Sequence, residues 1–158
     1  MLSNPSTSDT TLIDVHTHLD QYDPKELPDI LDRAHSAGVS LIIAAGTTLE
    51  SCRAILGICD EFEMIYAGVG LHPSDLSGIV DDVTADTLRE LAGNPKVITW
   101  SETGLDYMPA SPDRQIQHQA FRAQIRIATE LKLPLVIHSR EADPDTLQIL
   151  REENADSV

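Results

Sequence analysis

Cysteine and positively charged residues are both scarce in this sequence. Its 158 residues include two cysteines, Cys52 and Cys59, which lie seven positions apart in a segment with helical spacing. That placement argues against a disulfide and against a zinc site built on thiolates, so we expect two buried thiols in a reducing compartment. The 11 Lys and Arg residues are outnumbered by 26 Asp and Glu residues, which gives a net charge of −15. The sequence has no basic stripe that would attract nucleic acid over a wide surface.

Long apolar runs are also missing. No segment approaches the roughly 20 apolar residues that a membrane span requires, and the polar start MLSNPSTSDTT does not resemble a secretory signal. Hydrophobic residues make up 41% of the chain, which is enough for one packed core and unlike a disordered, collagen-like or disulfide-rich protein. We therefore expect a soluble cytoplasmic protein with a single domain over residues 11–158, preceded by a disordered tail over residues 1–10.

Apolar, β-rich segments alternate with segments of helical spacing along the chain, which is typical of an α/β fold with a parallel sheet. The predicted strands cover residues 11–16, 39–46, 64–70, 96–102 and 133–139. The predicted helices cover residues 24–37, 49–60, 85–92 and 112–131, and a fifth begins near residue 144. Pro24 is expected at the first position of the first helix, after Asp23 as its N-cap, and Thr84 is expected to cap the third helix.

Polar side chains gather where the predicted strands end. In the motif DVHTHLD, strand geometry turns Asp14, His16 and His18 toward one face. Glu102 and His138 follow two other strands, and the carboxyl ends of parallel strands meet at one edge of such a fold. Imidazole and carboxylate groups together suit zinc, manganese or magnesium. We therefore predict a site for one or two divalent ions, whose bound water would be activated for attack. Its ligands would be His16, His18, Glu102 and His138.

Each of these residues also has a plainer interpretation. A single histidine at a strand end, such as His138, is more often a surface or hydrogen-bonded residue than a ligand, and Glu102 could cap the helix that follows it. The combination of four donors is what favours a metal site. Other acidic and histidine residues receive minor roles: hydrogen-bonding supports for Asp14 and Asp20, and surface or packing positions for His35 and His118.

Five motifs carry a resemblance to a known family. They are DVHTHLD (14–20), GLHP (70–73), SETGLDY (101–107), QAFRAQ (119–124) and LPLVIHSREA (133–142). From about residue 12 onward, and in register, the chain resembles the TatD family of metal-dependent hydrolases. The resemblance implies a (β/α)₈ TIM barrel, one or two divalent ions, and hydrolysis of phosphodiester bonds in DNA, typically by 3′→5′ exonuclease activity.

The resemblance also implies which residues bind the metal. His16 and His18 match the first ligand pair of the family, Glu102 matches the bridging carboxylate, and His138 matches the next histidine ligand. Glu102 and His138 would thereby take part in catalysis.

Three further residues are implied to contact the substrate, which would be DNA or another phosphodiester, with no membrane partner. His72 and Arg140 fall where the family places groups near the scissile phosphate. Asp106 either orients a ligand or a substrate group, or caps the long fourth helix.

The chain departs from the family pattern in sequence and in length. The family's Gly-Glu-Ile-Gly-Leu-Asp appears here as SETGLD, residues 101–106, which keeps both carboxylates. A complete barrel needs about 250 residues, so these 158 residues accommodate about five of the βα units. A histidine after the sixth strand and an aspartate after the eighth have no counterpart, and none of Asp143, Asp145 and Asp156 fits. We expect a truncated or split protein that is completed by a complementary half or by self-association.

Two alternative functions remain open from the sequence. Amidohydrolase-like barrels, which cleave C–N or carboxylic ester bonds, also begin with a His-x-His motif, although GLHP and SETGLDY favour the TatD interpretation. The chain could also be a metal-binding or partner-binding half-barrel without catalytic activity.

Overall fold

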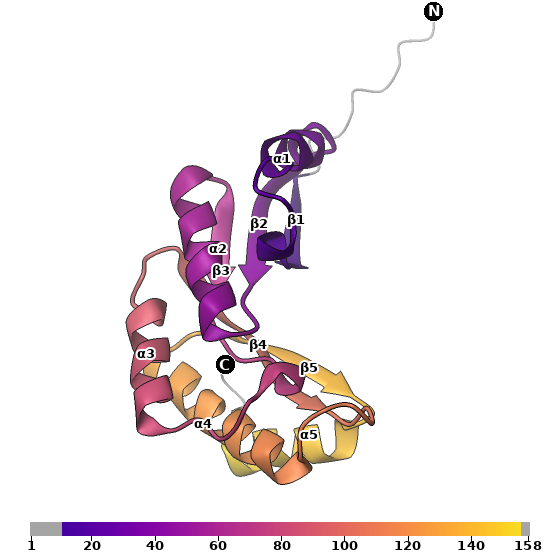
Figure 1. Ribbon diagram of the computed structural model, residues 1–158, viewed down its shortest axis with the longest axis vertical. Coiled ribbons are helices and arrows are strands. Elements are labelled where there is room, and N and C mark those ends of the chain that lie inside the picture. The colour runs from indigo at the N-terminus through magenta and orange to yellow at the C-terminus, as the bar shows by residue number, and fades with distance from the viewer. Residues whose placement is uncertain (1–10, 156–158) are drawn as a thin grey trace, which may run out of the picture.

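The structure, a computed structural model, describes residues 11–155. It contains one parallel sheet of five strands that lie in chain order (Figure 1). The strands are β1 (Leu12–Thr17), β2 (Val39–Ala45), β3 (Ile65–Gly68), β4 (Val97–Asp106) and β5 (Leu135–Arg140). The helices are α1 (Leu27–Ser36), α2 (Leu49–Glu61), α3 (Asp82–Ala92), α4 (Arg114–Leu131) and α5 (Asp143–Glu152), with short 3₁₀ turns η1 (Leu19–Gln21) and η2 (Pro73–Asp75). The predicted tail over residues 1–10 lies outside the described residues.

The helices bury one face of the sheet. In the described residues α1 packs on β2, α2 on β3, α4 on β4 and α5 on β5, and Figure 1 shows α4 and α5 together beneath β4 and β5. One core cluster includes Ile55, Leu88 and Trp100, and a second includes Leu105 and Phe121; all five side chains are fully buried. None of the helices in residues 11–155 has both the length and the apolar character needed to span a bilayer.

Two helices begin three residues away from the predicted start. α1 begins at Leu27 and not at Pro24, because Asp23 is used in a turn before the helix: its Oδ1 accepts the Lys25 N–H at 3.0 Å. α3 begins at Asp82, and Asp81 is its N-cap, with Oδ1 accepting the Thr84 N–H at 2.8 Å. Aspartate accepts backbone N–H groups well both in turns and at helix starts. Asp23 was therefore wrongly assigned as the cap of α1, whose N-cap position is Glu26, and Thr84 was wrongly assigned in place of Asp81.

β4 extends further than predicted and ends at Asp106. Gly104 makes the extension possible, because its φ of +144° favours glycine and a Cβ atom there would collide with the carbonyl oxygen of His138 on β5. Glu102 therefore lies inside a strand, and its interpretation as a helix cap is wrong.

β1 forms one edge of the sheet and is poorly covered. Leu12, Ile13 and Val15 are 47%, 57% and 59% exposed, respectively. Successive strand residues point to opposite faces, so both faces of β1 are open within the described part of the chain. The strand pairs with β2 along its other side.

Candidate metal centre

Curvature of the sheet brings distant strands to one point. β1 and β4 are separated by β2 and β3 in the sheet, a distance of about 14 Å if the sheet were flat, at about 4.8 Å per strand. Nevertheless Nε2 of His16 on β1 lies 3.2 Å from Oε2 of Glu102 on β4. The inward bend that barrel closure requires is therefore already present in five strands.

Glu102 lies at the centre of the site and presents its two oxygens to different partners. Oε2 lies 3.2 Å from Nε2 of His16, 3.8 Å from Nε2 of His18 and 3.9 Å from Nε2 of His72. Oε1 lies 3.0 Å from Nδ1 of His138. Two groups of possible metal ligands consequently share Glu102: one with His16 and His18, the other with His72 and His138.

His18 is oriented by the end of β2. Its Nδ1 lies 2.9 Å from the carbonyl oxygen of Ala45, which can only accept a hydrogen bond, so Nδ1 carries the proton of the neutral ring. The lone pair is then on Nε2, the atom that faces Glu102. A backbone carbonyl behind a histidine is the usual way in which a metal ligand is fixed in one tautomer.

His138 is oriented by Asp106 in the same way. Nε2 of His138 lies 3.0 Å from Oδ2 of Asp106, which is almost fully buried. Burial disfavours the charged carboxylate, but hydrogen bonds from the Met108 N–H, the Ser111 hydroxyl and His138 outweigh it and lower the pKa of Asp106 to about 2. Asp106 is therefore ionised at neutral pH and accepts the Nε2 proton, which leaves Nδ1 of His138 facing the site.

The contact between His138 and Glu102 has the chemistry of a cation site. With the proton on Nε2, the lone pair of Nδ1 faces Oε1 of Glu102 at 3.0 Å, and two acceptors repel one another unless a positive charge is shared between them. The hydrogen bond with Glu102 is the largest of the effects that raise the pKa of His138, so a second proton can supply that charge. A divalent cation bound by the two groups would take its place, and the donor set fits one.

His72 differs from His18 and His138. Its Nδ1 accepts the Ser74 N–H at 3.1 Å, so the proton of the neutral ring is on Nε2, the atom nearest Glu102 and His138. Burial is the main cause that lowers the pKa of His72, which keeps the ring neutral at pH 7. His72 therefore offers the site an N–H donor and not a lone pair, unlike a metal ligand.

Other residues singled out from the sequence have varied positions. Arg140 is exposed at the end of β5, where it pairs in register with Asp106, and its side chain forms no ion pair with another described residue. Asp106 does not cap α4, because that cap is Asp113. His35 is exposed on α1, and Nε2 of His118 lies 2.6 Å from the hydroxyl of Tyr107.

Asp14 and Asp20 belong to neither group of possible metal ligands. Oδ1 of Asp14 accepts the His16 N–H at 3.2 Å, and Oδ2 of Asp20 accepts the Ser51 hydroxyl at 2.7 Å, which ties η1 to α2. Both aspartates act as hydrogen-bonding supports.

Two buried glutamines on α4 were not predicted to be functional. Gln124 accepts the Leu71 N–H at 2.7 Å and the Trp100 Nε1–H at 3.1 Å, and donates to the Leu71 carbonyl at 3.1 Å. Gln117 accepts the Asp106 N–H and donates to the Asp106 carbonyl, both at 2.8 Å. The two glutamines thus hold the backbone beside His72 and the backbone of Asp106. Their position among apolar residues of α4 was the available signal, because a buried amide requires partners.

Comparison with known proteins gives the site its context. The family model of the TatD related DNases matches residues 13–158. An uncharacterized metal-dependent hydrolase of Bacillus subtilis, YabD, is 36% identical over 149 residues, which cover 93% of this chain and 58% of that protein. A protein of Citrobacter koseri named 3′-5′ ssDNA/RNA exonuclease TatD is 34% identical over 126 residues, covering 80% of this chain and 48% of that protein.

Solved structures agree with the sequence comparison. The crystal structure of YJJV, a TatD homologue from Escherichia coli K12, matches with a TM-score of 0.77 and 28% identity, over 90% of this chain and 56% of that one. The prediction of an incomplete (β/α)₈ barrel is confirmed by this likeness and by the order of the five parallel strands. The chain spans a little over half the length of YabD and YJJV. It belongs to the TatD related DNase family.

Proposed function

We propose that this chain provides the N-terminal part of the active site of a metal-dependent phosphodiesterase, a deoxyribonuclease that removes nucleotides from the 3′ end of a strand. The observation that carries the proposal is the position of Glu102, whose two oxygens face separate histidine groups. Two metal positions that share a bridging carboxylate are a common arrangement in phosphodiester hydrolysis. The name of the Citrobacter koseri relative supports a nucleic acid substrate.

The proposed ligands are His16, His18, Glu102 and His138, for one or two ions of magnesium, manganese or zinc. Such an ion would lower the pKa of a bound water and polarise a phosphoryl oxygen. The donor set of three imidazoles and one carboxylate suits zinc and manganese more readily than magnesium, which prefers oxygen ligands.

Three residues of the chain would act on the ligands or the substrate. Asp106 would hold the proton of His138 on Nε2 and so keep Nδ1 available, as its 3.0 Å contact supports. The Nε2–H of His72 would donate to a phosphate oxygen, because the ring is neutral and that proton points into the site. Arg140 would offer its planar guanidinium to a second phosphate oxygen once the strand is bound.

The strong negative charge of the chain restricts where DNA can be held. A net charge of −15 repels a polyanion at long range, whereas bound cations reverse the sign of the potential close to the site. Contacts with the substrate should therefore be confined to a few nucleotides around the scissile bond, which agrees with cleavage at a strand end.

Hydrolysis of labelled single-stranded DNA tests the proposal. The protein is incubated with a 5′-labelled oligonucleotide and manganese or magnesium, and products are separated by length. Because the chain supplies only the N-terminal part of the site, we expect a slow reaction that gives a ladder shortening from the 3′ end and that EDTA abolishes. His16→Ala should lower the rate by at least about tenfold.

His35→Ala is the matched control, because His35 is exposed on α1 and belongs to neither group of possible metal ligands. It should leave the rate unchanged. Equal rates for His16→Ala and the unchanged protein, or a rate that does not respond to EDTA, would refute the metal-dependent mechanism. Cleavage of small amides or carboxylic esters but not of DNA would support an amidohydrolase-like activity instead.

A further inference from the structure

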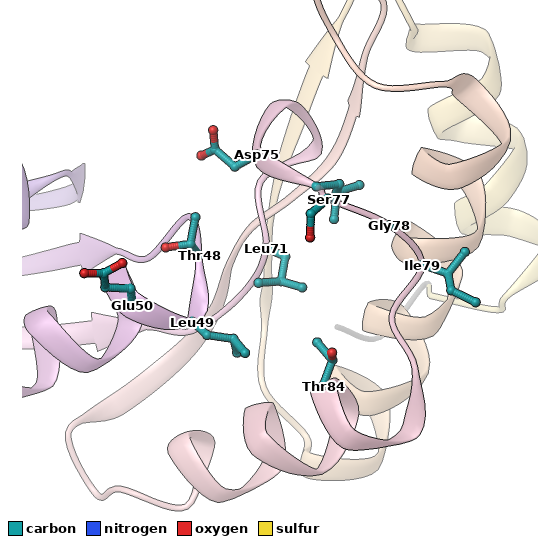
Figure 2. A pocket seen from close by; sticks show the side chains of 10 residues that line it. Thr48, Leu49, Glu50, Leu71, Asp75, Ser77, Gly78, Ile79 and Thr84 are labelled. Atoms are coloured by element: carbon teal, nitrogen blue, oxygen red, sulfur yellow. The ribbon is translucent and has the colours of Figure 1, made fainter.

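A groove lies beside the proposed metal centre and is not used by it. It has a volume of about 350 Å³, within the range of about 300–1,000 Å³ that is usual for small-molecule sites. Its walls come from the start of α2 and from the segment that joins β3 to α3 (Figure 2). The groove therefore lies at the carboxyl ends of β2 and β3, on the loops that follow these strands.

The groove and the metal centre share one loop. His72 lies directly after Leu71, which lines the groove, and three residues before Asp75, which also lines it. The loop is held from two sides: the His72 N–H donates to the carbonyl of Thr47 at 2.9 Å, and Gln124 bonds both backbone groups of Leu71. A molecule in the groove would consequently lie at a fixed place relative to the Nε2–H of His72.

The lining of the groove combines apolar and polar surface and has an acidic rim. Leu49, Leu71, Leu76 and Ile79 provide apolar surface, and Ile79 remains 57% exposed. Figure 2 shows Leu49 and Leu71 toward the middle of the groove and the carboxylates of Glu50 and Asp75 at its outer side. Apolar walls favour a flat, weakly hydrated group.

The negative charges of the rim would repel a phosphate group from the groove. The carboxylates of Glu50 and Asp75 form no hydrogen bond or ion pair with another described side chain, so both are free to accept hydrogen bonds. Glu50 also lies in the first turn of α2, where a carboxylate offsets the positive end of the helix dipole. An occupant should therefore carry amino groups and no negative charge.

We propose that this groove binds the nucleobase of the nucleotide whose phosphate lies at the metal centre. This inference rests on the proposed function. The ring of the base would lie against Leu71 and Ile79, its exocyclic amino group would donate to Glu50 or Asp75, and its phosphate would stay outside, beside His72. Bases with an exocyclic amino group are thus preferred over bases without one.

Binding of free nucleosides tests the inference without any need for catalysis. The ¹⁵N-labelled protein is titrated with adenosine, with purine riboside, which lacks the amino group, and with ribose 5-phosphate, which lacks the base. Adenosine should shift the amide signals of Thr48, Glu50 and Ser77 with saturation. Purine riboside should bind more weakly, and ribose 5-phosphate should leave these three signals in place.

Two glycine substitutions make a matched pair for the titration. A Cβ atom at Gly78, which lines the groove, or at Gly57, which is exposed on α2, meets no atom within 4 Å. Gly78→Phe should fill the groove and weaken adenosine binding by about tenfold or more, whereas Gly57→Phe should not change it. A Glu50→Gln, Asp75→Asn double variant should remove the preference for adenosine over purine riboside, and it remains informative if Gly78→Phe does not fold.

The outcomes separate this inference from the proposed function. Absence of saturable shifts at the groove up to the solubility limit of adenosine, or equal effects of Gly78→Phe and Gly57→Phe, would refute the nucleobase site, and metal-dependent DNA cleavage could still stand. Saturable binding of adenosine at the groove in a protein that does not cleave DNA would keep the groove assignment as a nucleoside site and refute phosphodiesterase activity of this chain by itself.

Discussion

Asp106 determines which nitrogen of His138 can bind a metal ion. Its carboxylate is ionised, accepts the proton on Nε2, and is itself held by the Met108 N–H at 2.9 Å and the Ser111 hydroxyl at 2.8 Å. Both of these bonds end on Oδ1, which leaves Oδ2 for His138. The position of the proton on the His138 ring thus depends on Asp106, which does not itself face Glu102.

Asp106→Asn tests this dependence. The amide keeps an oxygen for the Met108 N–H and the Ser111 hydroxyl, but it turns an NH₂ group toward Nε2 of His138. The ring must then carry its proton on Nδ1, the atom that faces Glu102, to avoid two opposed donors. We expect manganese affinity, measured by calorimetry, to fall about 10–100-fold.

Ser111→Ala serves as the control for this substitution, because it removes one bond to Oδ1 and leaves the contact of Oδ2 with His138 in place. It should change manganese affinity by much less. Unchanged affinity in Asp106→Asn, or an equal loss in Ser111→Ala, would contradict the tautomer assignment.

Cys52 and Cys59 should be inert in the folded protein. Both are free and buried, and burial raises the pKa of each thiol from about 9 to about 11. At pH 8 we expect no alkylation of the folded protein by iodoacetamide and alkylation of both thiols after denaturation, as read by mass spectrometry. Rapid alkylation of the folded protein would show that the thiols are accessible.

The same shift predicts a dependence of stability on pH. The folded state retains the thiol protons between pH 9 and pH 11, whereas the unfolded state releases them. The stabilisation is therefore complete below pH 9 and is lost as the pH rises through about 11. Urea denaturation at pH 8 and pH 10 should show the decrease, and a Cys52→Ser, Cys59→Ser variant should show less of it.

α4 does more than cover β4. Its buried side carries Gln117 and Gln124, which bond to backbone groups at the end of β4 and after β3, respectively, so the helix fixes the two segments from which His72 and Asp106 reach the site. The side-chain amide of a glutamine can form the hydrogen bonds that a backbone N–H or carbonyl group lacks. Without it, these groups would be buried without a partner.

Gln124→Leu should therefore be destabilising although leucine fits an apolar core. The substitution leaves two backbone groups of Leu71 and the Trp100 Nε1–H without their partner, and each unsatisfied buried group costs about 1–3 kcal/mol. We expect the free energy of unfolding in urea to fall by about 3 kcal/mol or more. Gln119→Leu, at an exposed position of the same helix, should change it by about 0.5 kcal/mol or less. Similar values for both variants would contradict the role of Gln124.

The order of strands and helices could be predicted because it depends on local patterns. The alternation of apolar strand segments with segments of helical spacing is visible in the sequence, and apolar residues of these segments, such as Ile42, Ile55 and Phe121, are buried. Helix starts were less predictable, since Asp23 and Asp81 compete with their neighbours for the same backbone N–H groups. The end of β4 was misplaced because the residues after Glu102 look like a loop in sequence, while pairing of Thr103–Asp106 with β5 keeps them in a strand.

The candidate metal centre could be predicted only in part, for a similar reason. The structure brings His16, His18, Glu102 and His138 together, and their residue types and spacing had indicated this. The sequence could not indicate which nitrogen of each ring carries a proton, because that depends on partners far along the chain, such as Ala45 for His18. Nor could it indicate that His72 is held as a donor by the Ser74 N–H.

The molecule as described has an open sheet. β1 exposes Ile13 and Val15 and pairs with a neighbour on one side, within residues 11–155. An uncovered apolar edge strand is a template for association with another strand. We expect β1 to be covered by a complementary segment or by a second copy of the chain.

An Ile13→Lys, Val15→Lys variant tests whether β1 mediates self-association. Charged side chains on an edge strand oppose strand pairing between molecules, so sedimentation velocity should show less concentration-dependent association than for the unchanged chain. Val83→Lys is the control, since Val83 is 75% exposed but lies on α3. A monomer at all concentrations for all three proteins would exclude pairing between copies.

The bend that brings His16 to Glu102 has a thermodynamic consequence. An ion held by side chains of β1, β4 and β5 would bind only the curved form of the sheet, so its binding free energy would be added to the stability of that form. Linkage is reciprocal. A partner that binds only the curved form of the sheet should raise the affinity for the ion, and the ion should raise the affinity for that partner by the same factor. Assembly with a partner and metal binding would then both shift the same equilibrium, toward the curved form of the sheet.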